Sequence, residues 1–460
     1  MKTSVEPLEG NKVKVSVEVD ESELEPAIDA AFKRIAREVR LPGFRPGKAP
    51  RKLLEARIGV LAAREEAFRE ALPEWYARAV RDHDVDVIAA PEIDITAGQE
   101  AGPVAFDAVV EVRPRVQIAG YESLRVEIPS PHPSDDDVEA QLERIRDQYA
   151  ELETVERPAD EGDRVLIDIE GTRDGEPVEG LSATDYLYEV GLGAVAPELD
   201  EELRGASAGD ELFIEVDEEG HEDHDHGPLQ LEVTVKEVRE KILPELTDEW
   251  AAEASEFDTV EELRADLRDR LARTRIVQAE TALREKAAEA LAALVDDELP
   301  EALVSSEVQH RLQDMAMRLQ AQGIQLEQYL QLTGRAPEDF IAELRDAADR
   351  AVRVDLGLRA LAEAEGIEPT DDDLEEELRE VAERVNQPVD VVRATLEQQE
   401  QIAGIRSELR SRAALAWLVE RVEVVDPDGN AIDRADLELP PDEPDESDEA
   451  PESDEEEDDQ

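Results

Sequence analysis

The second half of this chain carries a helical pattern with no strand signal inside it. From about Leu246 to Val419, hydrophobic residues recur at helical spacing, and the longest run starts near Thr259, a suitable N-cap. That run extends to Leu294, which gives about 35 residues, well beyond an ordinary globular helix. We therefore expect a body made only of helices, with further helices at about 300–322, 325–332, 337–364, 370–386 and 389–420.

The first part of the chain mixes strand and helix signals. Four valines at every second position from Val13 to Val19 indicate a half-buried strand, and Ser22 is a candidate N-cap for a helix that reaches Val39. The segment from Arg51 to about His83 is also helical, with a break at Gly59 and a second candidate break at Pro73. Two strands, at 85–96 and 104–118, complete an α+β domain.

The middle of the chain predicts a connector followed by a small β-rich domain. Ser134 caps a helix whose apolar stripe is Val138, Leu142, Ile145 and Tyr149. After Pro158, short strands are expected at 164–170, 186–190, 211–216 and 229–238.

With 460 residues the chain is too long for one core, so the fold class is α+β multidomain. The expected parts are an N-terminal domain at 1–115, a linker and arm helix at 116–158, the β-rich domain with a short helix at 159–243, the helical body at 244–425 and a tail at 435–460. That tail holds fifteen acidic and no basic residues, which predicts disorder.

The charge of the chain restricts its partners. A formal charge of −70 disfavours DNA and anionic membranes everywhere except at a local basic patch. The absence of cysteine excludes disulfides, thiolate metal sites and cysteine nucleophiles. We find neither the apolar core of a signal peptide nor a run long enough to span a bilayer, so a cytoplasmic location is expected.

One basic island interrupts this acidity. Between residues 33 and 57 there are two acidic residues, Glu38 and Glu55, and nine basic ones: Lys33, Arg34, Arg37, Arg40, Arg45, Lys48, Arg51, Lys52 and Arg57. Inside the island lies a loop of residues 43–50 that combines cations, an aromatic ring and backbone able to approach a partner closely. From the residues alone, the loop is either an anion-docking site or a solvated helix end with Phe44 folded back on the core.

With these pieces in order, the chain resembles the bacterial trigger factors, ribosome-associated chaperones, over everything except the acidic tail. The loop is similar to that family's docking motif, Gly-Phe-Arg-x-Gly-x-x-Pro. The phrases at 161–165 and 243–247 are similar to the edges of its FKBP-type prolyl isomerase domain.

The resemblance implies a docking site on the large ribosomal subunit near the exit tunnel, on both protein and rRNA. Its residues would be Gly43, Phe44, Arg45, Pro46, Gly47, Lys48 and Pro50. The resemblance also implies nascent and unfolded polypeptides as clients, assistance to folding and export, and a homodimer away from the ribosome. It implies neither a cofactor nor a membrane or DNA partner.

The isomerase domain needs an apolar pocket rather than a nucleophile, because rotation about a prolyl bond breaks no covalent bond. In the resembling segment the pocket positions are Ile169, Val178, Tyr186, Val195, Ala196, Leu199 and Leu231. Two features depart from the family: Glu198-Leu199 replaces Gly-aromatic, and a short acidic loop at 219–227 replaces the flap with its tyrosine. An active isomerase and a folded module with weak or no activity are both open.

That loop contains His221, His224 and His226 among carboxylates, a composition that suits zinc or nickel. The spacing matches no ordered metal motif, and a polar loop flanked by glycines is stable without a metal. We therefore predict no metal site.

The helical body contains the candidate client contacts Leu312, Met315, Met317, Leu319 and Tyr329, together with Ile324, Leu326 and Leu330. Methionine suits such a surface because it packs adaptably. An ordinary interhelical core would use the same residues.

For the whole chain, two alternatives to a docked chaperone are open. One is a freestanding FKBP-type isomerase, which leaves the basic island without a function. The other is a noncatalytic scaffold organised by the acidic tail.

Overall fold

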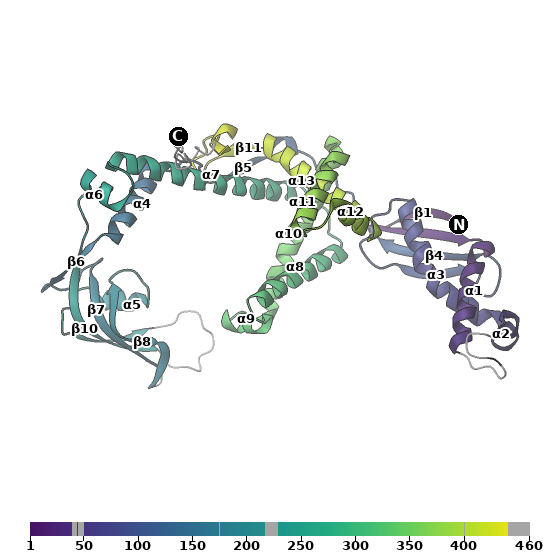
Figure 1. Ribbon diagram of the computed structural model, residues 1–460, viewed down its shortest axis with the longest axis horizontal. Coiled ribbons are helices and arrows are strands. Elements are labelled where there is room, and N and C mark those ends of the chain that lie inside the picture. The colour runs from purple at the N-terminus through teal and green to yellow at the C-terminus, as the bar shows by residue number, and fades with distance from the viewer. Residues whose placement is uncertain (39–43, 45–49, 174, 217–228, 400, 440–460) are drawn as a thin grey trace, which may run out of the picture. The chain divides into compact units, whose positions relative to one another are not determined.

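The computed structural model describes residues 1–38, 44, 50–173, 175–216, 229–399 and 401–439. Two compact units make up the chain. The first comprises Met1–Ile128 and Thr281–Ala431, and the second comprises Pro129–Glu280 and the segment from Ile432. Each unit combines strands with helices (Figure 1), so the α+β multidomain class is confirmed.

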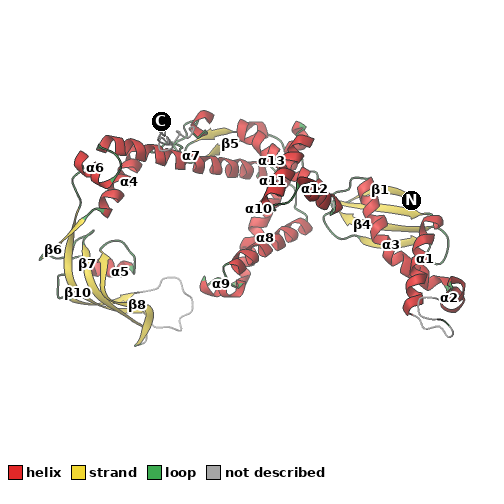
Figure 2. Ribbon diagram, in the orientation of Figure 1, coloured by secondary structure: helices red, strands yellow, loops and turns green. Residues whose placement is uncertain are grey.

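An antiparallel sheet of four strands begins the first unit, in the order β1-β2-β4-β3. Its strands are β1 (Lys2–Leu8), β2 (Lys12–Val19), β3 (Glu92–Ala97) and β4 (Val104–Glu111). Alternate residues of β2 and β4 are buried, and helices α1 (Glu21–Glu38) and α3 (Val60–Asp82) cover the face that they form (Figure 2).

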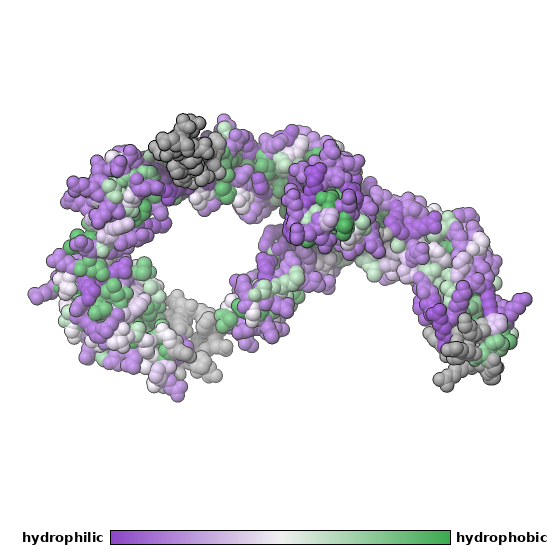
Figure 3. All heavy atoms as spheres, viewed as in Figure 1, coloured by the Kyte–Doolittle hydropathy of each residue, from purple (hydrophilic) through white to green (hydrophobic). Residues whose placement is uncertain are grey.

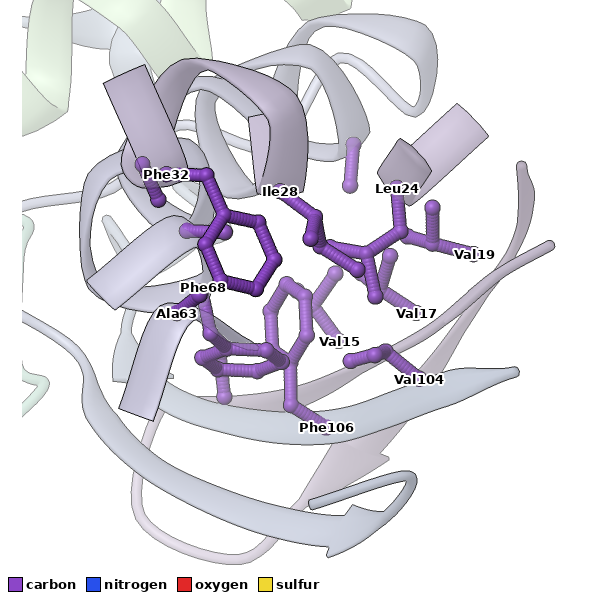
Figure 4. Close-up of a cluster of buried hydrophobic side chains, with 14 of the residues drawn as sticks. Val15, Val17, Val19, Leu24, Ile28, Phe32, Ala63, Phe68, Val104 and Phe106 are labelled. Carbon is purple, nitrogen blue, oxygen red and sulfur yellow. The ribbon is translucent and has the colours of Figure 1, made fainter. Parts of the chain in front are cut away.

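The core between these helices and the sheet is aromatic. Figure 4 shows Phe32 of α1 and Phe68 of α3 pointing toward Phe106 of β4. The rings of Phe68 and Phe106 meet edge to face at 6.3 Å between centroids, the arrangement that aromatic pairs prefer. Both helices are thereby fixed on the sheet.

The predicted break at Gly59 is confirmed, because Gly59 has φ 86° and separates α2 (Arg51–Ile58) from α3. Pro73 does not break α3: the turns on both sides of it are held by buried Phe68 and Ala79. The N-cap expected at Ser22 was also wrong, since the carbonyl of Asp20 accepts the N–H groups of Glu23 and Leu24.

The helical part of the first unit follows the predicted helices closely. Its helices are the end of α7 (Val260–Ala292), α8 (Glu301–Ala321), α9 (Leu326–Leu332), α10 (Pro337–Glu365), α11 (Asp371–Arg384), α12 (Val389–Gln398) and α13 (Ile402–Arg421). The single helix expected at 389–420 is two helices, because α12 packs on α11 while α13 packs on α10. After the short helix η1 (Tyr121–Ser123), strand β5 (Arg125–Glu127) pairs in parallel with β11 (Glu423–Val425).

The second unit contains a five-stranded antiparallel sheet in the order β6-β10-β7-β8, with β9 also paired to β10. Its elements are α4 (Asp135–Gln148), β6 (Glu151–Val155), β7 (Arg164–Arg173), β8 (Glu176–Glu189), α5 (Pro197–Leu203), β9 (Glu211–Val216), β10 (Leu229–Ile242), α6 (Asp248–Ala254), the start of α7 and the short helix η2 (Arg434–Leu437). All four predicted strands are present, and β6 is an addition within the expected linker.

Local capping signals were accurate in this unit. The Ser134 hydroxyl accepts the Asp137 N–H at 3.1 Å, and the Asp137 carboxylate accepts the Ser134 N–H at 2.8 Å, a capping box that begins α4. Thr259 and Glu262 form the same reciprocal pair at the start of α7.

The first residues of the tail expected at 435–460 are part of the described structure. Residues up to 439 are described; η2 ends at Leu437, which is buried, and residues 440–460 lie outside the described part. Among the described helices, none is long and apolar enough to cross a membrane.

Candidate functional site

The candidate docking surface lies where α1, α2 and α3 meet. Of its predicted residues the structure describes Phe44 and Pro50, while Gly43, Arg45, Pro46, Gly47 and Lys48 lie outside the described residues. The Phe44 side chain is 41% exposed. A ring this exposed contributes little to the core, so it is available for a partner.

The basic island divides into two groups. Arg34 forms ion pairs with Glu66 and Glu70, and Arg51 pairs with three carboxylates. Four other cations of α1 and α2 are exposed and have no ion-pair partner among the described residues: Lys33, Arg37, Lys52 and Arg57. Among the described residues, these four can meet phosphate or carboxylate groups without first breaking an internal pair.

Exposed aliphatic side chains accompany these cations. Leu53 on α2, with Val60 and Leu61 at the start of α3, are each more than 40% exposed. Figure 3 shows green, hydrophobic spheres in the region of α2. These three residues were not predicted to be exposed, although the pair Val60 and Leu61 directly after Gly59 could have indicated that not every aliphatic residue there faces the core. The surface suits a partner that offers both anionic groups and apolar contacts.

The isomerase candidates lie in the core of the second unit's sheet. Six of the seven belong to one hydrophobic cluster, in which Ile169, Ala196, Leu199 and Leu231 are buried, whereas Val178 and Val195 are partly buried. Tyr186 is outside that cluster and 40% exposed, with its ring 6.3 Å from that of Tyr188. The structure thus brings six of the seven predicted positions together in one core, while Tyr186 lies outside it and is the most exposed of the seven.

A buried carboxylate that the sequence analysis missed organises the neighbouring loop. Asp200, 6% exposed, accepts hydrogen bonds from the Tyr188 hydroxyl at 2.9 Å and from the N–H groups of Gly191 and Gly193 at 2.6 and 2.7 Å. Burial, and then the bond to Asp200, raises the pKa of Tyr188 to about 12. The loop that carries Val195 and Ala196 is therefore pinned to β8 and α5.

A second polar network fixes the strand that carries Tyr186. Lys236 Nζ lies 2.6 Å from Asp168 and 2.7 Å from Asp185, and the Asp185 N–H donates to Asp168 at 2.8 Å. These carboxylates raise the pKa of Lys236, Asp168 most strongly. Because Asp185 has φ 58° at an irregularity in the β7–β8 pairing, the network stabilises a conformation that costs energy.

The loop at 219–227, with its three histidines, lies outside the described residues. The prediction that it binds no metal stays a prediction.

The candidate client residues on α8 and α9 differ in exposure. Met317 is 61% exposed, Leu319 is buried, and the other predicted residues are partly buried. Two exposed residues were missed, Leu332 in α9 at 73% and Ile341 in α10 at 56%. Hydrophobic residues are visible on the surface over α8 and α9 in Figure 3.

Comparisons with known proteins agree over most of the chain. Family models described as bacterial trigger factor protein and its C-terminus match residues 1–145 and 259–420. Trigger factor of Nocardia farcinica is 38% identical over 95% of this chain and 94% of that protein. Trigger factor of Geobacillus kaustophilus is also 38% identical, over 92% of this chain and 100% of that protein.

A solved structure of the trigger factor chaperone, from work on its promiscuous substrate recognition in folding and assembly activities, has a similar fold. It covers 92% of this chain and 100% of its own, at 24% identity, with a TM-score of 0.51.

Proposed function

This chain belongs to the bacterial trigger factor family of ribosome-associated chaperones, and we propose from that membership that it acts at the exit tunnel of the large ribosomal subunit. There it binds nascent polypeptides, keeps them in an open conformation and assists folding and export. Its location is the cytoplasm, and away from the ribosome it forms a homodimer.

The observation that carries the docking proposal is the exposure of Phe44, together with four exposed cations of α1 and α2 that have no ion-pair partner among the described residues. A ribosomal surface offers rRNA phosphates and the carboxylates of ribosomal proteins, both of which attract such cations. An exposed ring adds an apolar contact or a stack on a base. The alternatives explain less, since neither a freestanding isomerase nor a scaffold organised by its tail uses this surface.

Ribosome co-sedimentation tests the docking proposal. Replacing Phe44, Arg45 and Pro46 with alanine should abolish sedimentation with ribosomes, because it removes the ring and a cation together. The helical circular dichroism should be unchanged, since Phe44 lies outside the buried core. Undiminished sedimentation of the triple variant would refute this docking site.

Client binding is proposed for the exposed residues of α8, α9 and α10. Replacing Met317, Leu332 and Ile341 with serine should weaken the suppression of aggregation of an unfolded client, because these side chains expose apolar area without a partner. Val385 and Val391, each 49% exposed on another part of the helical body, provide matched control substitutions. An equal effect of both sets would show that general surface hydrophobicity, and not this segment, holds clients.

Isomerase activity is proposed for the β-rich domain on the strength of the family resemblance and the apolar cluster. A protease-coupled assay on a proline tetrapeptide measures it. Tyr186→Ala should lower kcat/KM, because Tyr186 is the most exposed of the pocket candidates, whereas Phe213→Ala, a change at an exposed aromatic residue outside that set, should not. A wild-type rate equal to the uncatalysed rate would reduce the domain to a noncatalytic module.

A further inference from the structure

Arg51 of the basic island contacts three carboxylates and one aromatic ring. Its Nη1 donates to Glu25 at 2.5 Å and also to Asp29, and its Nε donates to Glu55 at 2.6 Å. Its guanidinium lies over the ring of Phe32, 5.1 Å from the centroid. An isolated surface pair contributes little, but here one planar group joins three carboxylates and an aromatic face.

These contacts join α2 to α1. Glu25, Asp29 and Phe32 belong to α1, where they follow one another at spacings of four and three residues and so lie on one face. Phe32 is itself anchored in the aromatic core (Figure 4). Arg51 is the first residue of α2 and directly follows Pro50, the last residue of the predicted docking loop.

Helix α2 has little else to hold it. It has eight residues, its N-cap Pro50 provides no side-chain hydrogen bond, and among its described side chains only Leu54 is buried. So short a helix is unstable alone. A cation in its first turn also opposes the helix dipole, so the tertiary contacts of Arg51 must offset that cost.

We propose that Arg51 is a positioning residue for ribosome docking, which holds α2, and with it the C-terminal end of the 43–50 loop, against α1. The inference rests on the proposed function of that loop. It assigns direct contact with the anionic partner to other cations, such as the adjacent Lys52, which is exposed and has no ion-pair partner among the described residues.

The sharpest test changes the acidic partners and leaves every cation in place. The double variant Glu25→Gln, Asp29→Asn makes the docking domain more positive, so simple attraction to the ribosome predicts tighter binding. Positioning by Arg51 predicts the opposite, a loss of about tenfold in affinity. The conservative exchange Glu25→Asp, Asp29→Glu keeps both charges and should restore most of the binding.

A matched control removes two acidic residues that do not contact Arg51. Glu65 and Glu74 of α3 are exposed and have no ion-pair partner among the described residues. Glu65→Gln with Glu74→Gln changes the charge by the same amount and should leave ribosome affinity unchanged or raise it.

Hydrogen exchange of the free protein gives a readout that does not need the ribosome. Amides of α2 should exchange about tenfold faster in the Glu25→Gln, Asp29→Asn variant, while those of β2 stay protected. Unchanged ribosome affinity, or unchanged α2 exchange, would overturn the role of Arg51. If the wild type itself fails to sediment with ribosomes, the proposed function falls, and the exchange data alone then decide whether Arg51 holds α2.

Discussion

At the scale of single residues, two buried charged groups satisfy backbone that regular structure leaves unpaired. Arg64, 3% exposed, donates from Nε to the carbonyl of Gly98 at 2.7 Å and from a second nitrogen to Gly102. Asp200 accepts hydrogen bonds from the N–H groups of Gly191 and Gly193. The sequence does not indicate that either residue is buried, because their partners are backbone atoms of loops, which hydrophobic periodicity does not predict.

The Asp200 network predicts a local loss of stability. Asp200→Ala leaves the Tyr188 hydroxyl and two N–H groups without their acceptor, which should destabilise the β-rich domain by about 3 kcal/mol. Exchange of the β7 amides would report that loss. Glu201→Ala, at an exposed neighbour, is the control and should change nothing. Equal protection in both variants would mean that water replaces the carboxylate.

Tyr188 predicts a change at alkaline pH. Its pKa is about 12 in the folded domain, against an ordinary value of about 10. The folded state therefore holds the proton more tightly, and the stability from this group is complete below pH ~10 and is lost as the pH rises toward ~12. The absorbance difference between wild type and Tyr188→Phe should show tyrosinate forming near pH 12. Formation near pH 10 would contradict the buried hydrogen bond.

At the scale of elements, most helices and caps were predicted correctly, apart from the cap at Ser22 and the single helix at 389–420, whereas the contacts between helices were not visible in the sequence. The box between Ser134 and Asp137 and the box between Thr370 and Asp373 both form at predicted helix starts. The sequence pattern does not explain why a glycine, Gly357, lies in the middle of α10. A Cβ added there would lie 3.2 Å from Leu291 Cγ of α7, so the glycine permits these helices to approach closely.

Two glycine substitutions in helices should therefore have opposite effects. Gly357→Leu should lower the unfolding free energy by about 1–3 kcal/mol, because the added side chain meets a filled contact. Gly404→Ala in α13, where a Cβ meets nothing within 4 Å, should raise it by about 0.5–1 kcal/mol through helix propensity. Chemical denaturation followed by circular dichroism would measure both changes. A stabilising Gly357→Leu would disprove the close approach.

At the scale of the whole molecule, the net charge of −70 makes the stability of the folded chain depend on salt. The folded chain repels itself, and this repulsion is screened by salt. The proposed docking surface would instead gain affinity by releasing counterions from its partner, and added salt would remove that gain.

Potassium chloride should accordingly act in opposite directions on stability and on docking. Over about one decade of concentration, from ~50 to ~500 mM, the midpoint temperature of thermal unfolding should rise while ribosome affinity falls. Near the isoelectric point of about 4.2 the effect on the midpoint should vanish, because the net charge does. A midpoint that falls with salt at neutral pH would show that local ion pairs outweigh the net repulsion.

The sequence by itself predicted most of the helices and strands, because hydrophobic periodicity and capping act between residues close in the chain. It missed β1, β6 and the division of 389–420 into two helices. The four strands predicted after Pro158 in the β-rich domain are present, whereas the docking loop stays a prediction. Only the tertiary structure decided which cations are available to a partner, since Arg34 and Arg51 form ion pairs with carboxylates of neighbouring helices. It likewise decided that Asp200 is buried and that Leu332 and Ile341 are exposed, because burial depends on residues distant in the chain.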